Sequence, residues 1–248
     1  MLNDEKKQNN RKHIAIGCVT DKGKRESNED SVWFAVDGSE AICLVADGIG
    51  GLKDGEISSS TAVGAAIRYW KKSKGRSDIK QIFVEAHAEI RERVEKTNEK
   101  TGTTLSVFHC RENEFSIGHA GDSRIYRITK APFPKLMLLT QDDTWAAEKV
   151  REGAMNAVEA AAHPKRHSLT NCLGGFQECS VFETSGYINP KDIFLLCSDG
   201  LYRYFDESEL KKIISKRGEA QQTAEELTKI ALSRGSDDNI SVIVIQFP

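Results

Sequence analysis

The chain has 248 residues, of which 39% are hydrophobic and 29% are charged. This length suits one large domain with a single core, and this composition excludes a chain that stays disordered for lack of apolar residues. The formal net charge at pH 7 is only −2, so no overall field attracts the chain to nucleic acid or to an anionic membrane.

The first dozen residues are rich in Lys, Asn and Asp and contain no apolar core segment. We therefore expect a flexible tail over residues 1–12, no ordinary secretory signal and a cytoplasmic location. No apolar run approaches the roughly 18 to 20 residues that a membrane-spanning helix needs, so no membrane partner is expected. The six cysteines form no Cys-x-x-Cys pair, which favours buried reduced thiols over a zinc or disulfide framework.

Short apolar or alternating segments predict strands in the first half of the chain. They lie at 14–19, 32–36, 42–46, 104–109, 114–120, 124–129 and 136–139. After the third segment the apolar spacing becomes helical, and it predicts one helix over about 57–72 and a second whose apolar face runs from Ile79 to Ile90. Ser77 and Asp78 supply a cap for the second helix.

The last third of the chain repeats this order. Strands are expected near 181–188 and 193–197, helices around 207–216 and 219–234, and a closing strand at 240–247. Groups of strands separated by helix pairs disfavour a doubly wound parallel sheet, so we predict an α+β fold with mainly antiparallel pairing. The segment 142–173 begins as a helix and becomes Ala-rich and basic, and we interpret it as an insertion over the sheet.

Several of the predicted strands adjoin an aspartate. Asp47, Asp122 and Asp199 each follow an apolar strand, and Asp238 lies just before the last one. Taken singly, each is also typical of a tight turn. Together, carboxylates held at strand ends repel one another unless a cation lies among them, and carboxylates without histidines favour Mg²⁺ or Mn²⁺ over zinc. Two such ions about 4 Å apart activate water and clamp a phosphoryl oxygen, which indicates phosphoester hydrolysis.

Two segments near these aspartates add weaker signals. Arg25 precedes the carboxylate pair Glu29 and Asp30 by four and five residues, and a guanidinium there suits a phosphate group. A solvated surface turn is the alternative interpretation of this segment. The loop 47–55 contains four glycines, which allow close backbone approach to a ligand, but its spacing matches neither a Walker loop nor a dinucleotide fingerprint, and a flexible turn explains it equally well.

In combination, these motifs resemble the metal-dependent protein phosphatases of type 2C, the PPM family, and its bacterial-type members in particular. The matching residues occur in the family's order over nearly the whole chain: Arg25, 28–30, 45–48 with Gly50 and Gly51, 102–104, Gly118, 121–124, 139–140, 198–201 and 238–239. The resemblance implies a central antiparallel β-sandwich flanked by pairs of α-helices, in one catalytic domain over residues 13–248.

The resemblance also implies a set of metal ligands. By position, Asp47 bridges two Mn²⁺ or Mg²⁺ ions, the Gly48 carbonyl binds one of them, and Asp199 and Asp238 complete the other. Asp122 serves a weaker third ion.

The catalytic residues follow from the same resemblance. Glu29 and Asp30 hold waters on the ions, and Arg25 binds the substrate phosphate. Family members with a histidine after the Asp-Gly pair use it as general acid, but this chain has Ile49 there. Protonation of the leaving group must then come from water or from another group.

The segment 145–168 falls where bacterial members carry a variable flap beside the active site. Its basic cluster, consisting of His163, Lys165, Arg166 and His167, either steers phosphoprotein substrates or is an exposed solvated loop.

The implied activity is hydrolysis of phosphoserine and phosphothreonine esters in phosphorylated proteins. The enzyme is expected to be a monomer that opposes a cognate serine/threonine kinase. One alternative is a catalytically inactive relative that acts as a regulatory binding module, which the presence of Asp47, Asp199 and Asp238 disfavours. Another is a dimetal hydrolase of nucleic acid or nucleotides, which the lack of a basic track disfavours.

Overall fold

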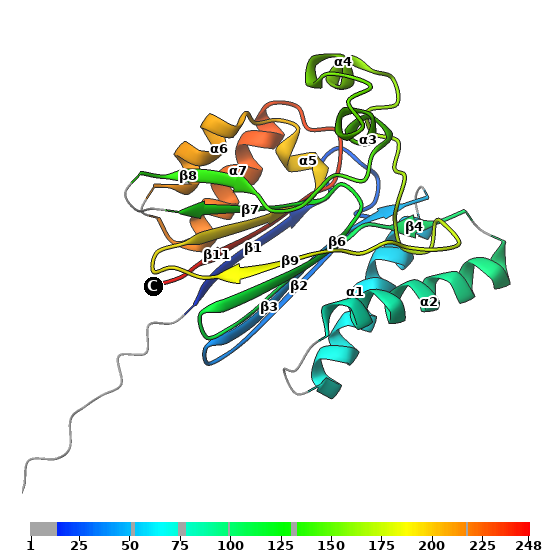
Figure 1. The fold of residues 1–248 in the computed structure, drawn as a ribbon, viewed down its shortest axis with the longest axis horizontal. Coiled ribbons are helices and arrows are strands. Elements are labelled where there is room, and N and C mark those ends of the chain that lie inside the picture. Colours follow the sequence, from blue (N-terminus) through cyan, green and yellow to red (C-terminus); the bar gives the residue numbers. More distant parts are fainter. Residues whose placement is uncertain (1–13, 51–52, 74–77, 99, 130–132, 217) are drawn as a thin grey trace, which may run out of the picture.

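The computed structural model describes residues 14–248 apart from 51–52, 74–77, 99, 130–132 and 217. The expected tail over 1–12 and the capping residue Ser77 therefore lie outside the described residues. Two antiparallel sheets pack face to face, and helices cover their outer faces (Figure 1). This arrangement confirms the predicted α+β fold with a central antiparallel sandwich.

The first sheet has five strands in the order β1-β11-β10-β7-β8. Their bounds are Ala15–Asp21 for β1, Arg124–Thr129 for β7, Lys135–Leu138 for β8, Ile193–Cys197 for β10 and Ile240–Gln246 for β11. The inner strands β10 and β11 are buried almost throughout and are composed mainly of aliphatic and β-branched residues, which suit a strand covered on both faces.

The second sheet has six strands, with the path β2-β3-β5-β6-β9 and β4 paired to β3. The bounds are Asp30–Asp37 for β2, Glu40–Ile49 for β3, Gly102–Thr103 for β4, Leu105–Arg111 for β5, Glu114–Ala120 for β6 and Phe182–Tyr187 for β9. Strand β3 continues past Asp47, because Gly48 pairs with Thr103 of β4. Asp47 therefore lies within a strand and not in a tight turn after it.

Helix pairs cover the two sheets. Helices α1 (Lys53–Ser73) and α2 (Ile79–Thr97) pack on the second sheet, and α6 (Glu207–Ile214) and α7 (Ala220–Ser233) pack on the first (Figure 1). Asp78 caps α2 by accepting a hydrogen bond from the backbone of Gln81 at 3.3 Å, as its sequence position predicts. The short α5 (Asp199–Tyr202) follows β10, and α3 (Trp145–Arg151) and α4 (Ala157–Ala162) form a lobe above the sandwich (Figure 1).

The core between the sheets is aromatic. Phe108 of β5 and Phe194 of β10 are fully buried, with ring centroids 4.6 Å apart, and Ile243 of β11 belongs to the same cluster. Each such side chain contributes about 1.5 to 3 kcal/mol through its removal from water. The packing joins the two sheets rigidly, so that the ends of β3, β10 and β11 keep fixed relative positions.

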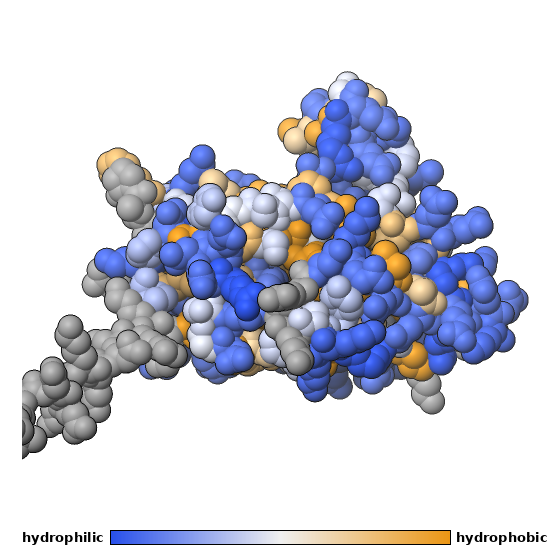
Figure 2. All heavy atoms as spheres, turned by 60° about the horizontal axis from the view of Figure 1, so that its bottom comes forward, coloured by the Kyte–Doolittle hydropathy of each residue, from blue (hydrophilic) through white to orange (hydrophobic). Residues whose placement is uncertain are grey.

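The surface is mainly hydrophilic. Figure 2 shows hydrophobic residues scattered over one face, with no single large patch. Within the described part of the chain, none of the helices combines the length and apolar character needed to cross a membrane. All six cysteines are free thiols, and four of them, Cys43, Cys110, Cys172 and Cys197, are buried.

Candidate metal centre

Five aspartates gather at one end of the sandwich. Asp30 begins β2 and pairs with Asp47 near the end of β3. Asp199 follows β10, Asp238 precedes β11, and Asp122 lies between β6 and β7. A cavity of about 340 Å³ is lined by four of these aspartates, all except Asp30, and by three further residues predicted for the site, Arg25, Glu29 and Gly48.

Burial makes these carboxylates costly to ionise. It raises the pKa of Asp47 well above its usual range, and the charges of Asp30 and Asp199 raise it further. Burial also raises the pKa of Asp30 to about 7 and that of Asp122 to about 8. For Asp199, burial raises the pKa to about 6 while the Arg203 guanidinium opposes that rise. Such a cluster favours a bound cation, which allows the carboxylates to ionise together.

Two buried carboxylate oxygens favour a metal in particular. Within the described residues, Oδ1 of Asp30 and Oδ1 of Asp199 have no hydrogen-bond partner. The second oxygen of each carboxylate is held: Ser198 Oγ donates to Asp30 Oδ2 at 2.8 Å, and Arg203 forms an ion pair with Asp199 Oδ2. A buried polar atom without a partner is costly, and an ion or an ion-bound water at each oxygen would remove that cost.

The donor set fits a hard ion such as Mg²⁺ or Mn²⁺, because it consists of carboxylate and carbonyl oxygens. The described residues hold no group of three or more His, Cys, Asp or Glu side chains already arranged around one point.

A network of backbone and hydroxyl hydrogen bonds positions Asp47. Its backbone N–H donates to Thr104 Oγ1 at 2.9 Å, and its carbonyl accepts from Thr103 Oγ1 at 2.9 Å. The next residue, Gly48, has no room for a side chain, since a Cβ there would lie 2.2 Å from the carbonyl oxygen of Gly55. Glycine is therefore required where the chain carries the proposed carbonyl ligand.

Arg25 and Glu29 are tied to the segment before β11. Arg25 Nη2 donates to Asp238 Oδ2 at 2.9 Å, and the Glu29 backbone N–H donates to Asn239 Oδ1 at 2.8 Å. The Arg25 side chain is still 55% exposed. Arg25 is thus fixed to the rim of the cavity but remains accessible to a ligand. The alternative interpretation of this segment, a solvated surface turn, would not explain the fixed position.

Two residues of the cavity, Arg203 and Leu169, were not predicted from the sequence, and Arg203 is the charged one. Arg203 lines the cavity, pairs with Asp199, and approaches Asp122 Oδ2 at 3.7 Å. The available signal was its position four residues after Asp199, because residues at this spacing meet on one face of a helix.

The basic cluster of the flap divides into two parts. His163 stacks on Trp145 with ring centroids 4.4 Å apart, and Lys165 Nζ lies 5.7 Å from the centre of the same ring. Arg166 and His167 instead line a groove of about 780 Å³ beside the cavity, and His167 also lines the cavity itself. Burial, with the charges of Arg203 and Arg166, lowers the pKa of His167 to about 4, so His167 adds no positive charge near neutral pH.

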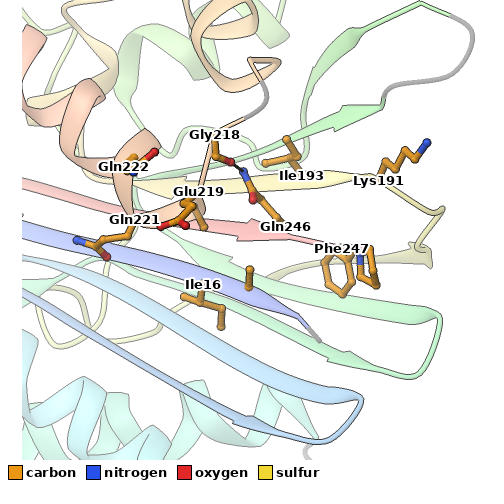
Figure 3. Close-up of a pocket in the computed structure, with 12 residues that line it drawn as sticks. Ile16, Lys191, Ile193, Gly218, Glu219, Gln221, Gln222, Gln246 and Phe247 are labelled. Carbon is orange, nitrogen blue, oxygen red and sulfur yellow. Dashed lines mark hydrogen bonds between the residues drawn. The ribbon is translucent and has the colours of Figure 1, made fainter. Parts of the chain in front are cut away.

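A larger cavity, of about 1030 Å³, lies at the other end of the first sheet (Figure 3). Ile193, at the start of β10, and Gln246, at the end of β11, line it, whereas Asp199 and Asp238 adjoin the opposite ends of these strands. Among the described residues, the charged side chains that line it are Lys191 and Glu219. This cavity lacks a cluster of carboxylates and is not the candidate metal centre.

Ser198→Ala is expected to weaken the metal centre without removing a ligand. Ser198 Oγ donates to Asp30 Oδ2 and accepts from the Ser241 backbone at 2.9 Å, so its loss leaves two buried groups unsatisfied. We expect a stability loss of about 1 to 3 kcal/mol and Mn²⁺ affinity about 10 to 100 times weaker. Denaturant unfolding measures the loss of stability, and calorimetric titration measures the loss of Mn²⁺ affinity.

Ser233→Ala is the control, because Ser233 is an exposed serine on a helix. It should change neither the stability nor the Mn²⁺ affinity. Equal effects of both variants would contradict the role of Ser198.

Comparisons with known proteins agree with this geometry. A family model described as "Protein phosphatase 2C" matches residues 22–233. The serine/threonine phosphatase stp of Listeria welshimeri is 30% identical over 240 residues, which cover 92% of this chain and 93% of that protein. The structure of the Mycobacterium tuberculosis serine/threonine phosphatase PstP/Ppp aligns with a TM-score of 0.84 at 28% identity, covering 94% of this chain and 98% of that one. The PstP catalytic domain in complex with 2 manganese ions aligns with a TM-score of 0.81 at 27% identity, covering 94% and 97%. The chain belongs to the protein phosphatase 2C family.

Proposed function

We propose that this chain is a protein serine/threonine phosphatase that hydrolyses phosphoserine and phosphothreonine esters at a site for two Mn²⁺ or Mg²⁺ ions. The observation that carries the proposal is the cluster of buried aspartates, with unpartnered oxygens on Asp30 and Asp199, next to Arg25. The names of the relatives support the reaction, and the manganese complex of PstP supports the type of ion.

The carboxylates of the site would serve two roles, ion binding and the orientation of water. Asp47, the Gly48 carbonyl, Asp199 and Asp238 would hold the two ions, and Glu29 and Asp30 would orient water within the site. When bound, the ions supply an activated water and stabilise the negative charge that develops on the phosphoryl group.

Arg25 orients the phosphate from the rim of the cavity. A guanidinium offers two parallel donors to a phosphate, and the exposure of this side chain leaves it accessible. Ile49, which also lines the cavity, cannot donate a proton, so a water molecule or another group protonates the leaving oxygen.

Arg25→Ala is expected to lower kcat/KM by about 10 to 100 times, the scale of one or two charge-assisted hydrogen bonds. Steady-state kinetics with a phosphothreonine peptide measure the change. The neighbouring Lys24→Ala removes an exposed charge whose Nζ donates to the Gly235 carbonyl at 3.2 Å, and it should have little effect. Equal kinetics for wild type and Arg25→Ala would exclude Arg25 from substrate binding.

The test of the function is phosphate release from matched phosphoserine, phosphothreonine and phosphotyrosine peptides, with Mn²⁺ or with a chelator. We expect release from the first two peptides, only with the ion. No release from any peptide would favour the alternative, an inactive relative that acts as a binding module. A cognate kinase, a cytoplasmic location, a monomeric state and the flap at 145–168 stay predictions. The third ion expected at Asp122 conflicts with Arg203, whose guanidinium lies 3.7 Å from Asp122 Oδ2.

A further inference from the structure

Arg203 lies between two buried carboxylates of the metal centre. It pairs with Asp199 Oδ2, and its Nη2 is 3.7 Å from Asp122 Oδ2. The side chains of Asp199 and Asp122 are only 9% and 6% exposed, and that of Arg203 is 27% exposed. The guanidinium thus provides positive charge at the place where two buried carboxyl groups meet.

Arg203 is the cation best placed to act on this pair. Arg124 also lies near Asp122, but its guanidinium forms hydrogen bonds with Asp142, the shortest at 2.6 Å, and stacks on the Tyr202 ring at 3.8 Å. Arg203 follows Asp199 by four residues, and its backbone N–H donates to the Asp199 carbonyl at 3.3 Å. The local turn therefore directs Arg203 back to Asp199, and a guanidinium stays charged at any physiological pH.

The two oxygens of Asp199 have separate environments. Oδ2 is occupied by Arg203, whereas Oδ1 is buried without a partner among the residues described. Asp199 can therefore bind an ion through Oδ1 and keep its contact with Arg203. A further divalent ion between Asp199 and Asp122 would compete with the guanidinium for Oδ2 and would be repelled by it.

We propose that Arg203 is a built-in cation for the Asp122–Asp199 pair and takes the place of a third divalent ion. The chain then binds two divalent ions and not three. This inference rests on the two-ion site of the proposed function, and it concerns only the number of ions and the residue that limits it.

Counting bound Mn²⁺ tests the inference without reference to activity. Electron paramagnetic resonance of unbound Mn²⁺, titrated into the millimolar range, is expected to give two ions for the wild-type chain and three for Arg203→Met. Methionine keeps an unbranched side chain but removes the charge. Arg203→Met combined with Asp122→Asn should return the count to two, since the third ion then loses a ligand.

Two variants control for folding and for unrelated loss of charge. Arg68→Met breaks an exposed ion pair with Glu89 on the helix layer, and it should leave the count at two. Asp122→Asn in the wild-type background should also leave two ions, and this test holds even if Arg203→Met does not fold.

Three results would overturn the role of Arg203: three ions on the wild-type chain, two on a folded Arg203→Met, or fewer ions after Asp122→Asn alone. A wild-type chain that binds no Mn²⁺ would overturn the two-ion site itself and this inference with it.

Discussion

Asp47→Asn is expected to reduce Mn²⁺-dependent phosphate release from a phosphothreonine peptide by about 1,000 times or more, which corresponds to at least about 4 kcal/mol. Asp47 lies within β3 and lines the cavity with three other aspartates, and we propose it as a ligand of both ions. The neutral amide keeps the shape of the side chain but removes the charge that holds them. Steady-state kinetics over a range of Mn²⁺ concentrations measure the loss.

The same substitution should stabilise the protein in the absence of metal. Burial and neighbouring carboxylates raise the pKa of Asp47, so removal of its charge relieves an unfavourable interaction. The melting temperature in chelator should therefore be higher than that of wild type.

Asp192→Asn is the matched control for Asp47→Asn. Asp192 is also buried, with its side chain 1% exposed, but it pairs with Arg127 away from the cavity. Its substitution should lower the melting temperature and leave the dependence on Mn²⁺ intact. Full activity in Asp47→Asn would refute the metal assignment.

For each site that Mn²⁺ saturates, the melting temperature of the wild-type chain is expected to rise by about 5 to 10 °C. At a free ion concentration 100 times Kd, one site adds about 2.7 kcal/mol to the free energy of unfolding, and each kcal/mol shifts a domain of this size by about 2 to 4 °C. Asp199 Oδ1, a buried oxygen of a proposed ligand that has no partner among the described residues, would gain one from the ion. Differential scanning calorimetry with Mn²⁺ and with chelator measures the shift.

Asp199→Asn should lose most of this stabilisation, because it removes one of the proposed ligands. Glu226→Gln, which breaks only the exposed pair with Lys216, should show the full shift. An Mn²⁺ shift of the same size in both variants would contradict the role of Asp199.

The strands were predictable because each has a short apolar or alternating pattern. Strands β6, β7 and β10 have the predicted bounds, and β11 differs by one residue. The short α5 was not predicted, since four residues are too few to show helical periodicity. Strand β3 proved longer than its apolar run, because pairing with Thr103 continues the ladder through Gly48.

The membership of the candidate site was also predictable, although its internal contacts were not. Seven of the eight residues assigned from the resemblance line one cavity, and the eighth, Asp30, is buried beside Asp47. Nothing in the local sequence indicated that Ser198 would hold Asp30 or that Asn239 would hold Glu29. These partners are separated by 168 and 210 positions in the chain, and a sequence pattern does not reveal such distant contacts.

The sequence by itself determined the α+β architecture and the chemistry of the candidate ligands, because apolar periodicity and residue type are local properties. Only the tertiary structure decided which carboxylates of the site pair with an arginine. Packing of the two sheets brings Asp122 and Asp199 together and directs Arg203 to both of them. Whether a buried carboxylate meets an arginine or remains open to an ion depends on side-chain positions that only folding establishes.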